Sequence, residues 1–133
     1  MGDFWPGNIL LTEADGPLAL VDWELAKTGL PGHDLGQFIA EIHLIRAFHP
    51  SLSGVCSDII DAFVEGYARE RGWATLVEGD PALSRDMLAH QAAHLIAWTP
   101  RIPWGDKQTT RAVVLEGYEL LNKCISSPKD TVQ

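Results

Sequence analysis

The amino-acid sequence predicts a predominantly α-helical α+β domain, in which one short β-hairpin precedes about four helices. Two observations support this fold class. Two apolar runs flank an Asp-Gly pair near the N-terminus, and apolar residues then recur every three or four positions along most of the chain. With 133 residues, 46% of them hydrophobic, the chain is long enough for one domain with its own core. We expect this domain to cover residues 1–125 and a frayed polar tail to cover 126–133.

The hairpin is predicted to pair strands near residues 9–13 and 18–22. Both segments are apolar, and Asp15-Gly16 between them is typical of a tight turn between antiparallel strands. A loop over residues 29–33 follows the second strand, because this segment contains two glycines and a proline.

Helical periodicity predicts four helices in the remaining chain. They run from Asp34 to His49-Pro50, from about Ser57 to Arg71, from after Pro81 to Pro100, and from about Thr109 to Ile125. Asp34 is a good N-cap for the first of them, and Ser84 is a candidate cap for the third.

The charge balance excludes some classes of partner. Ten basic and 18 acidic residues give a net charge of −8, whereas nucleic acids and anionic membranes bind clustered positive charge. A divalent cation or a cationic ligand is compatible with this balance. No apolar run approaches the ~20 residues that cross a bilayer. Cys56 and Cys124 match no metal or redox spacing, so we expect reduced thiols and a cytoplasmic protein.

The side chains suited to catalysis are concentrated before residue 35. Asp3 and Asn8 stand five apart just ahead of the first predicted strand, and Asp22 ends the second. Because a hairpin folds the chain back, Asn8 should lie near Asp22, and their oxygens could hold a hard cation such as Mg²⁺. Asp3 is then free to face a substrate hydroxyl. Phosphoryl transfer requires this layout: an acid that accepts the hydroxyl proton, beside a metal that neutralises the phosphates.

Three segments of the chain carry a family pattern. They are Gly2-Asp3-Phe4-Trp5-Pro6-Gly7-Asn8, Leu20-Val21-Asp22-Trp23-Glu24 and Gly29-Leu30-Pro31-Gly32-His33-Asp34-Leu35. Together they resemble the aminoglycoside phosphotransferase and choline kinase-like family. The resemblance implies a protein-kinase-like C-terminal lobe, with the catalytic loop, hairpin and metal-site segment in residues 1–35 and a helical part in residues 36–125.

The same resemblance implies a role for each matching side chain. Asp3 would be the catalytic base, Asn8 and Asp22 would bind Mg²⁺ and through it the cofactor ATP, and Asp34 would be a structural acid that supports the catalytic loop. The implied reaction is Mg-ATP-dependent transfer of a phosphoryl group to the hydroxyl of a small molecule. The pattern names neither a specific acceptor nor an oligomeric state.

The chain departs from the family pattern in two ways. The family motif begins with His, where this sequence has Met1. The family's N-terminal lobe supplies a phosphate-covering loop and a Lys that holds ATP, whereas no glycine-rich phosphate loop occurs in this sequence. We therefore expect a truncated lobe with an incomplete ATP site, inactive as this chain alone. The alternative is a non-catalytic remnant or pseudoenzyme lobe that acts, if at all, by binding another protein.

Two groups of side chains in the later helices allow more than one interpretation. His90 and His94 are four apart on a predicted helix, and packing or a substrate-facing wall suits them better than zinc, since no third ligand is evident. Trp98, Arg101 and Trp104 flank a proline-rich loop, which they either anchor or turn into an acceptor pocket.

Acidic side chains on the first two predicted helices also have two interpretations. They are Glu41, Asp58, Asp61 and Glu65. They form either a solvated face or a rim that attracts a cationic acceptor, of which the solvated face is the commoner arrangement.

Overall fold

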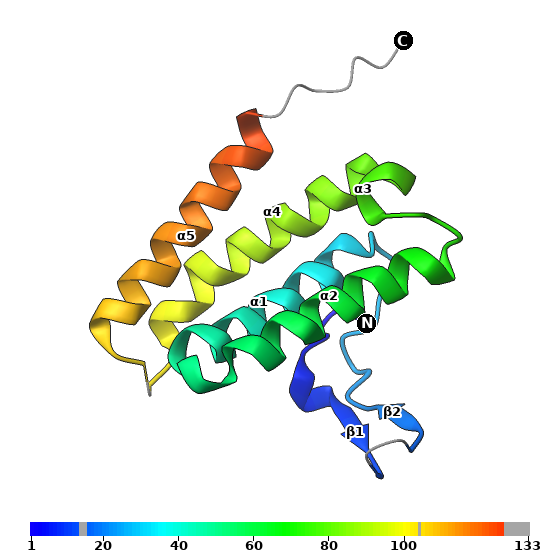
Figure 1. The fold of residues 1–133 in the computed structure, drawn as a ribbon, viewed down its shortest axis with the longest axis horizontal. Coiled ribbons are helices and arrows are strands. Elements are labelled where there is room, and N and C mark those ends of the chain that lie inside the picture. Colours follow the sequence, from blue (N-terminus) through cyan, green and yellow to red (C-terminus); the bar gives the residue numbers. More distant parts are fainter. Residues whose placement is uncertain (14–15, 104, 127–133) are drawn as a thin grey trace.

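The computed structural model describes residues 1–13, 16–103 and 105–126 and confirms a predominantly helical α+β fold (Figure 1). The strands are β1 (Ile9–Leu11) and β2 (Leu18–Leu20), and the helices are α1 (Gly32–Phe48), α2 (Ser53–Glu70), α3 (Leu76–Gly79), α4 (Pro81–Trp98) and α5 (Lys107–Ser126). Single 3-10 turns occur at Pro6–Asn8, Pro50–Leu52 and Thr99–Arg101. Helix α1 packs against both α2 and α4, and α5 packs on α4.

The hairpin is antiparallel as predicted, with Ile9 opposite Leu20 and Leu11 opposite Leu18. Each strand has three residues, so both are shorter than the predicted segments 9–13 and 18–22. The hairpin projects away from the helices (Figure 1), and its apolar side chains are therefore exposed, except that of Ile9, which packs against Phe38 and Ile42 of α1. Asp15 of the predicted turn lies outside the described residues, as do Trp104 and residues 127–133 of the predicted tail.

The predicted cap of the first helix is wrong. Helix α1 begins at Gly32, two residues before Asp34, and Pro31 occupies the N-cap position. The backbone of Pro31 is already helical, with φ −60° and ψ −25°, so the helix can start earlier than the predicted loop allows. Asp34 lies in the first turn, where its carboxylate is available to another part of the chain.

The starts of the next long helices also differ from the prediction. Helix α2 begins at Ser53 rather than near Ser57, because the 3-10 turn Pro50–Leu52 leads directly into it. Helix α4 is capped by Asp80, whose carboxylate accepts a hydrogen bond of 2.8 Å from the Leu83 amide. Ser84, the predicted candidate cap, is buried inside α4.

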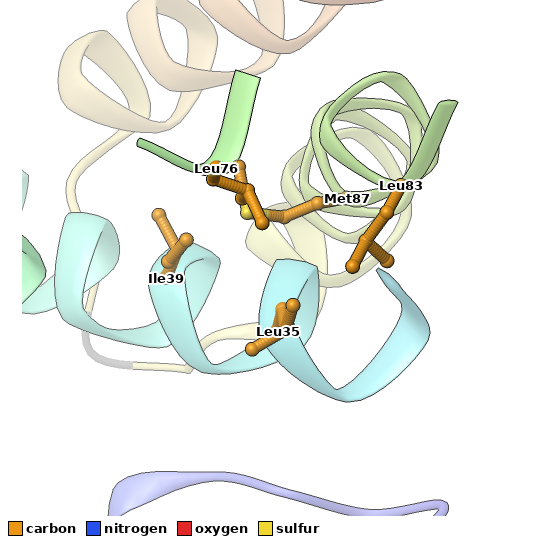
Figure 2. Close-up of a cluster of buried hydrophobic side chains, with 5 residues drawn as sticks. All are labelled: Leu35, Ile39, Leu76, Leu83 and Met87. Carbon is orange, nitrogen blue, oxygen red and sulfur yellow. The ribbon is translucent and has the colours of Figure 1, made fainter. Parts of the chain in front are cut away.

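The core lies on both sides of α1. Figure 2 shows one cluster between α1, α3 and α4, formed by Leu35, Ile39, Leu76, Leu83 and Met87. A second cluster, where α1, α4 and α5 meet, contains Leu44, Leu95 and Val113. Helix α1 is thus fixed from several directions, and its position determines where its polar side chains lie. In the described part of the chain, no helix combines the length and apolar character required to cross a membrane.

Candidate active site

The loop that precedes β1 is fixed by its second residue. Gly2 has φ +97°, which favours glycine, and a Cβ there would collide with the carbonyl oxygen of Leu25. Its amide donates a hydrogen bond of 2.8 Å to Asp34 Oδ1, and the Met1 amine lies 2.5 Å from Asp34 Oδ2. Asp34, which does not cap α1, thus connects the start of α1 to the loop.

The same contacts determine the ionisation of Asp34. Burial raises the pKa of this carboxyl, but the hydrogen bonds from the Met1 amine and the Gly2 amide outweigh it and leave the pKa below its usual value. The carboxylate form is therefore the one that holds the loop.

Asp3 is held at both its backbone and its side chain. Asn8 Nδ2 donates to the Asp3 carbonyl oxygen at 3.1 Å, and Gln37 Nε2 donates to Asp3 Oδ1 at 2.6 Å. Gln37 is a contact that sequence reasoning missed. The only sign of this contact in the sequence is the spacing of Gln37, which follows Asp34 by three residues. The two side chains therefore lie on the same face of α1.

Asn8 links Asp3 to the end of the second strand. The residue is 5% exposed, and its backbone carbonyl oxygen accepts a hydrogen bond of 3.1 Å from the backbone amide of Val21, the residue before Asp22. Asp22 has φ 65°, a left-handed conformation that is uncommon outside glycine and concentrates at functional sites. Asp3 and Asp22 line one cavity. The structure therefore brings together the three residues that the sequence analysis grouped.

The cavity beside these residues has a volume of about 670 Å³. Trp5 and Trp98 contribute aromatic surface to its lining, and Leu44 and Ile45 contribute aliphatic surface. Its volume lies within the range of ~300–1,000 Å³ typical of small-molecule sites. Arg101 also lines the cavity, and its guanidinium donates to the carbonyl of Ala97.

Glu41 and His94 form an ion-pair-like contact on the cavity wall. His94 Nε2 lies 2.8 Å from Glu41 Oε1, and each side chain is 18% exposed. The solvated-face interpretation is therefore wrong for Glu41, because α4 covers this part of α1. The other acids considered with it, Asp58, Asp61 and Glu65, are all exposed and do not line this cavity.

The two histidines of α4 do not share a site. His94 contacts Glu41 and lines the cavity, as the substrate-facing-wall interpretation requires. His90 instead contacts Asp86 at 3.6 Å and lies edge-on to the ring of His33. Within the described residues, no group of three or more His, Cys, Asp or Glu side chains is placed to hold a metal ion.

Comparison with known proteins shows that the chain is similar to phosphotransferases. The model of the phosphotransferase enzyme family matches residues 2–85. A 4-hydroxytryptamine kinase of Psilocybe cyanescens is 31% identical over 128 residues, which cover 92% of this chain and 33% of that protein. A 4-hydroxytryptamine kinase of Psilocybe cubensis is 30% identical over 127 residues, which cover 88% of this chain and 32% of that protein. The chain thus spans about a third of the length of these relatives, and no solved structure matches it significantly.

Proposed function

The chain belongs to the phosphotransferase enzyme family, and from this premise we propose that it carries the catalytic base, the metal ligands and the acceptor pocket of a Mg-ATP-dependent kinase. The acceptor would be the hydroxyl group of a small molecule. The observation that carries this proposal is that Asp3 and Asp22 line one cavity, while the buried Asn8 bonds to the Asp3 backbone and to Val21, the residue before Asp22.

In the proposed reaction, Asp3 accepts the proton of the acceptor hydroxyl. The acceptor oxygen then forms a bond to the γ-phosphorus of ATP, while the bond from that phosphorus to the β–γ bridging oxygen breaks and ADP leaves. Asp3 lines the cavity, so an acceptor bound there places its hydroxyl within reach of the carboxylate.

Asn8 and Asp22 are the proposed Mg²⁺ ligands. Their amide and carboxylate oxygens are hard donors, which suit Mg²⁺, and an ion that keeps several waters needs only one or two such ligands from the protein. Asn8 and Asp22 therefore fit this metal by their chemistry, although the described residues contain no group of three or more His, Cys, Asp or Glu side chains that could hold a metal ion. When bound, Mg²⁺ would neutralise negative charge on the phosphate oxygens.

For the acceptor, we propose an aromatic hydroxyl compound that carries a cationic amino group. The relatives are named 4-hydroxytryptamine kinases, and the cavity offers complementary groups for such a molecule. Trp5 and Trp98 provide aromatic surface, while the Glu41 carboxylate, mostly shielded from water, suits an ammonium group.

Radiolabel transfer from γ-labelled ATP to 4-hydroxytryptamine in the presence of Mg²⁺ tests this function, measured in a full-length version of the protein with an N-terminal ATP-binding lobe restored. Asp3→Asn and Asp22→Asn should each lower transfer by about 100-fold or more, because each removes a group used in the transition state. Asp58→Asn, at an exposed acid of α2, is the matched control. Unchanged transfer in Asp22→Asn would contradict the metal assignment.

One observation favours a second candidate function, a non-catalytic lobe that binds another protein. The hairpin exposes a group of apolar side chains, and such patches mark contact surfaces. They are Leu10, Leu11, Leu18 and Leu20. Calorimetric titration of this chain with Mg-ATP separates an autonomous enzyme from a non-catalytic lobe: saturable micromolar binding supports the autonomous enzyme, and no heat supports the non-catalytic lobe.

A further inference from the structure

Gln37 is a partly buried side chain on the face of α1 that meets the catalytic loop. Its Nε2 donates a hydrogen bond of 2.6 Å to Asp3 Oδ1. Within the described residues, no hydrogen bond to Asp3 Oδ2 is found. We propose that Gln37 is a positioning residue, which fixes the Asp3 carboxylate in one rotamer and leaves Oδ2 for the acceptor hydroxyl. This inference rests on the proposed function, because that function makes Asp3 the base.

Three hydrogen bonds constrain Asp3 and the residue before it. The Gly2 amide donates to Asp34 Oδ1 at 2.8 Å, and the backbone carbonyl oxygen of Asp3 accepts from Asn8 Nδ2 at 3.1 Å. These two bonds fix the backbone but leave rotation about the Asp3 side-chain bonds free. The bond from Gln37 removes that remaining freedom, which matters because a reacting group displaced by about 1 Å can lose 100-fold in rate.

The chemistry of an amide suits this task. A Lys or Arg in its place would pair with the Asp3 carboxylate and reduce its ability to attract a proton. The neutral amide of Gln37 instead orients one oxygen and leaves the negative charge on the group. Its own anchor is rigid, because the neighbouring Gly36 packs so closely on α4 that a Cβ there would collide with the backbone of Met87 and Gln91.

The first experiment measures the rotamer of Asp3 in the full chain and in Gln37→Met, which keeps the side-chain length and removes the donor. Three-bond couplings between Hα and the two Hβ of Asp3 report this rotamer by NMR. A single rotamer gives either one large and one small coupling or two small couplings; we expect one of these patterns in the wild-type chain and two averaged couplings in Gln37→Met. Gln108→Met, at an exposed glutamine of α5, should leave the wild-type pattern unchanged.

The second experiment asks whether the fixed oxygen meets the acceptor. By calorimetry, the wild-type chain should bind 4-hydroxytryptamine about tenfold more tightly than tryptamine, because a hydrogen bond to a charged group is lost without the hydroxyl. In Gln37→Met this preference should fall to about twofold, because the affinity for 4-hydroxytryptamine should fall more than the affinity for tryptamine; Gln37 itself lines the cavity. A purely structural role would weaken binding of both ligands equally.

The two experiments fail independently. Wild-type couplings that persist in Gln37→Met, or that are already averaged in the wild-type chain, overturn the inference about Gln37. Averaging in Gln37→Met, combined with no hydroxyl preference in the wild-type chain, supports Gln37 as the residue that fixes Asp3 and overturns the acceptor contact of the proposed function.

Discussion

Replacing Glu41 with Gln tests the acceptor pocket most directly. The substitution removes a negative charge from the cavity wall and keeps the side-chain shape. A glutamine oxygen can still accept the hydrogen bond that now joins Glu41 Oε1 to His94 Nε2 at 2.8 Å. We expect the affinity for tryptamine, which carries an ammonium group, to fall about tenfold, whereas the affinity for uncharged 3-ethylindole should not change.

The magnitude follows from the burial of Glu41. Its side chain is 18% exposed, so the effective dielectric constant lies well below that of water. Opposite charges about 4 Å apart then attract by about 4 kcal/mol, of which desolvation of the ammonium cancels a large part. A net loss of about 1.4 kcal/mol corresponds to the tenfold change.

Isothermal titration calorimetry with both ligands measures the effect without relying on indole fluorescence. Glu116→Gln is the matched control, because Glu116 also lies 2.8 Å from a histidine nitrogen, that of His43, and does not line this cavity. Wild-type tryptamine affinity in Glu41→Gln, or an equal loss for both ligands, would refute the assignment of Glu41 to the amino group.

Three further predictions concern the framework of the site. Gly36→Ala should lower the free energy of unfolding, measured in urea, by about 1–3 kcal/mol, because a Cβ there collides with the backbone of α4. Gly54→Ala is the control and should not lower the free energy of unfolding, because a Cβ at Gly54 faces open space. The hydrogen bonds that lower the pKa of Asp34 should make the free energy of unfolding of the wild-type chain larger than that of Asp34→Asn at neutral pH. This difference in stability should disappear as the pH falls below 3.8 and through the lowered pKa of Asp34, because the carboxyl is then protonated. A stability difference that persists at lower pH would contradict the prediction. Burial, aided by Arg46 and opposed by Glu116, lowers the pKa of His43, so its ring protons should titrate by NMR with a midpoint below 6.5 rather than above it.

The parts of the fold that local sequence patterns determine were predicted. The hairpin and the four long helices follow from periodicity over stretches long enough to show it. The first residues of the helices were less predictable, because several neighbouring residues can serve as the N-cap. In α4, Asp80 caps the helix in place of the predicted Ser84. Helix α3 was missed because its four residues, Leu76–Gly79, are too few to show a periodicity.

The candidate site divides in the same way. Asp3, Asn8 and Asp22 could be grouped in advance because a hairpin alone brings the ends of its strands together. Glu41 could not be placed, because its environment depends on how α1 and α4 pack. In an isolated helix it would face solvent, but α1 lies between α2 and α4, so even polar positions on it are partly covered.

One face of α1 connects the parts of this site. Asp34, Gln37 and Glu41 are spaced by three and then four residues, so they lie along one stripe of the helix. The first holds the loop, the second holds the base, and the third belongs to the cavity wall. Four residues of helix rise by about 6 Å, and this rise sets the separation along the helix axis between the groups that would meet the acceptor's hydroxyl and its ammonium. Because α1 is rigidly packed, the proposed pocket should discriminate between acceptors by the distance between these two groups as well as by their chemistry.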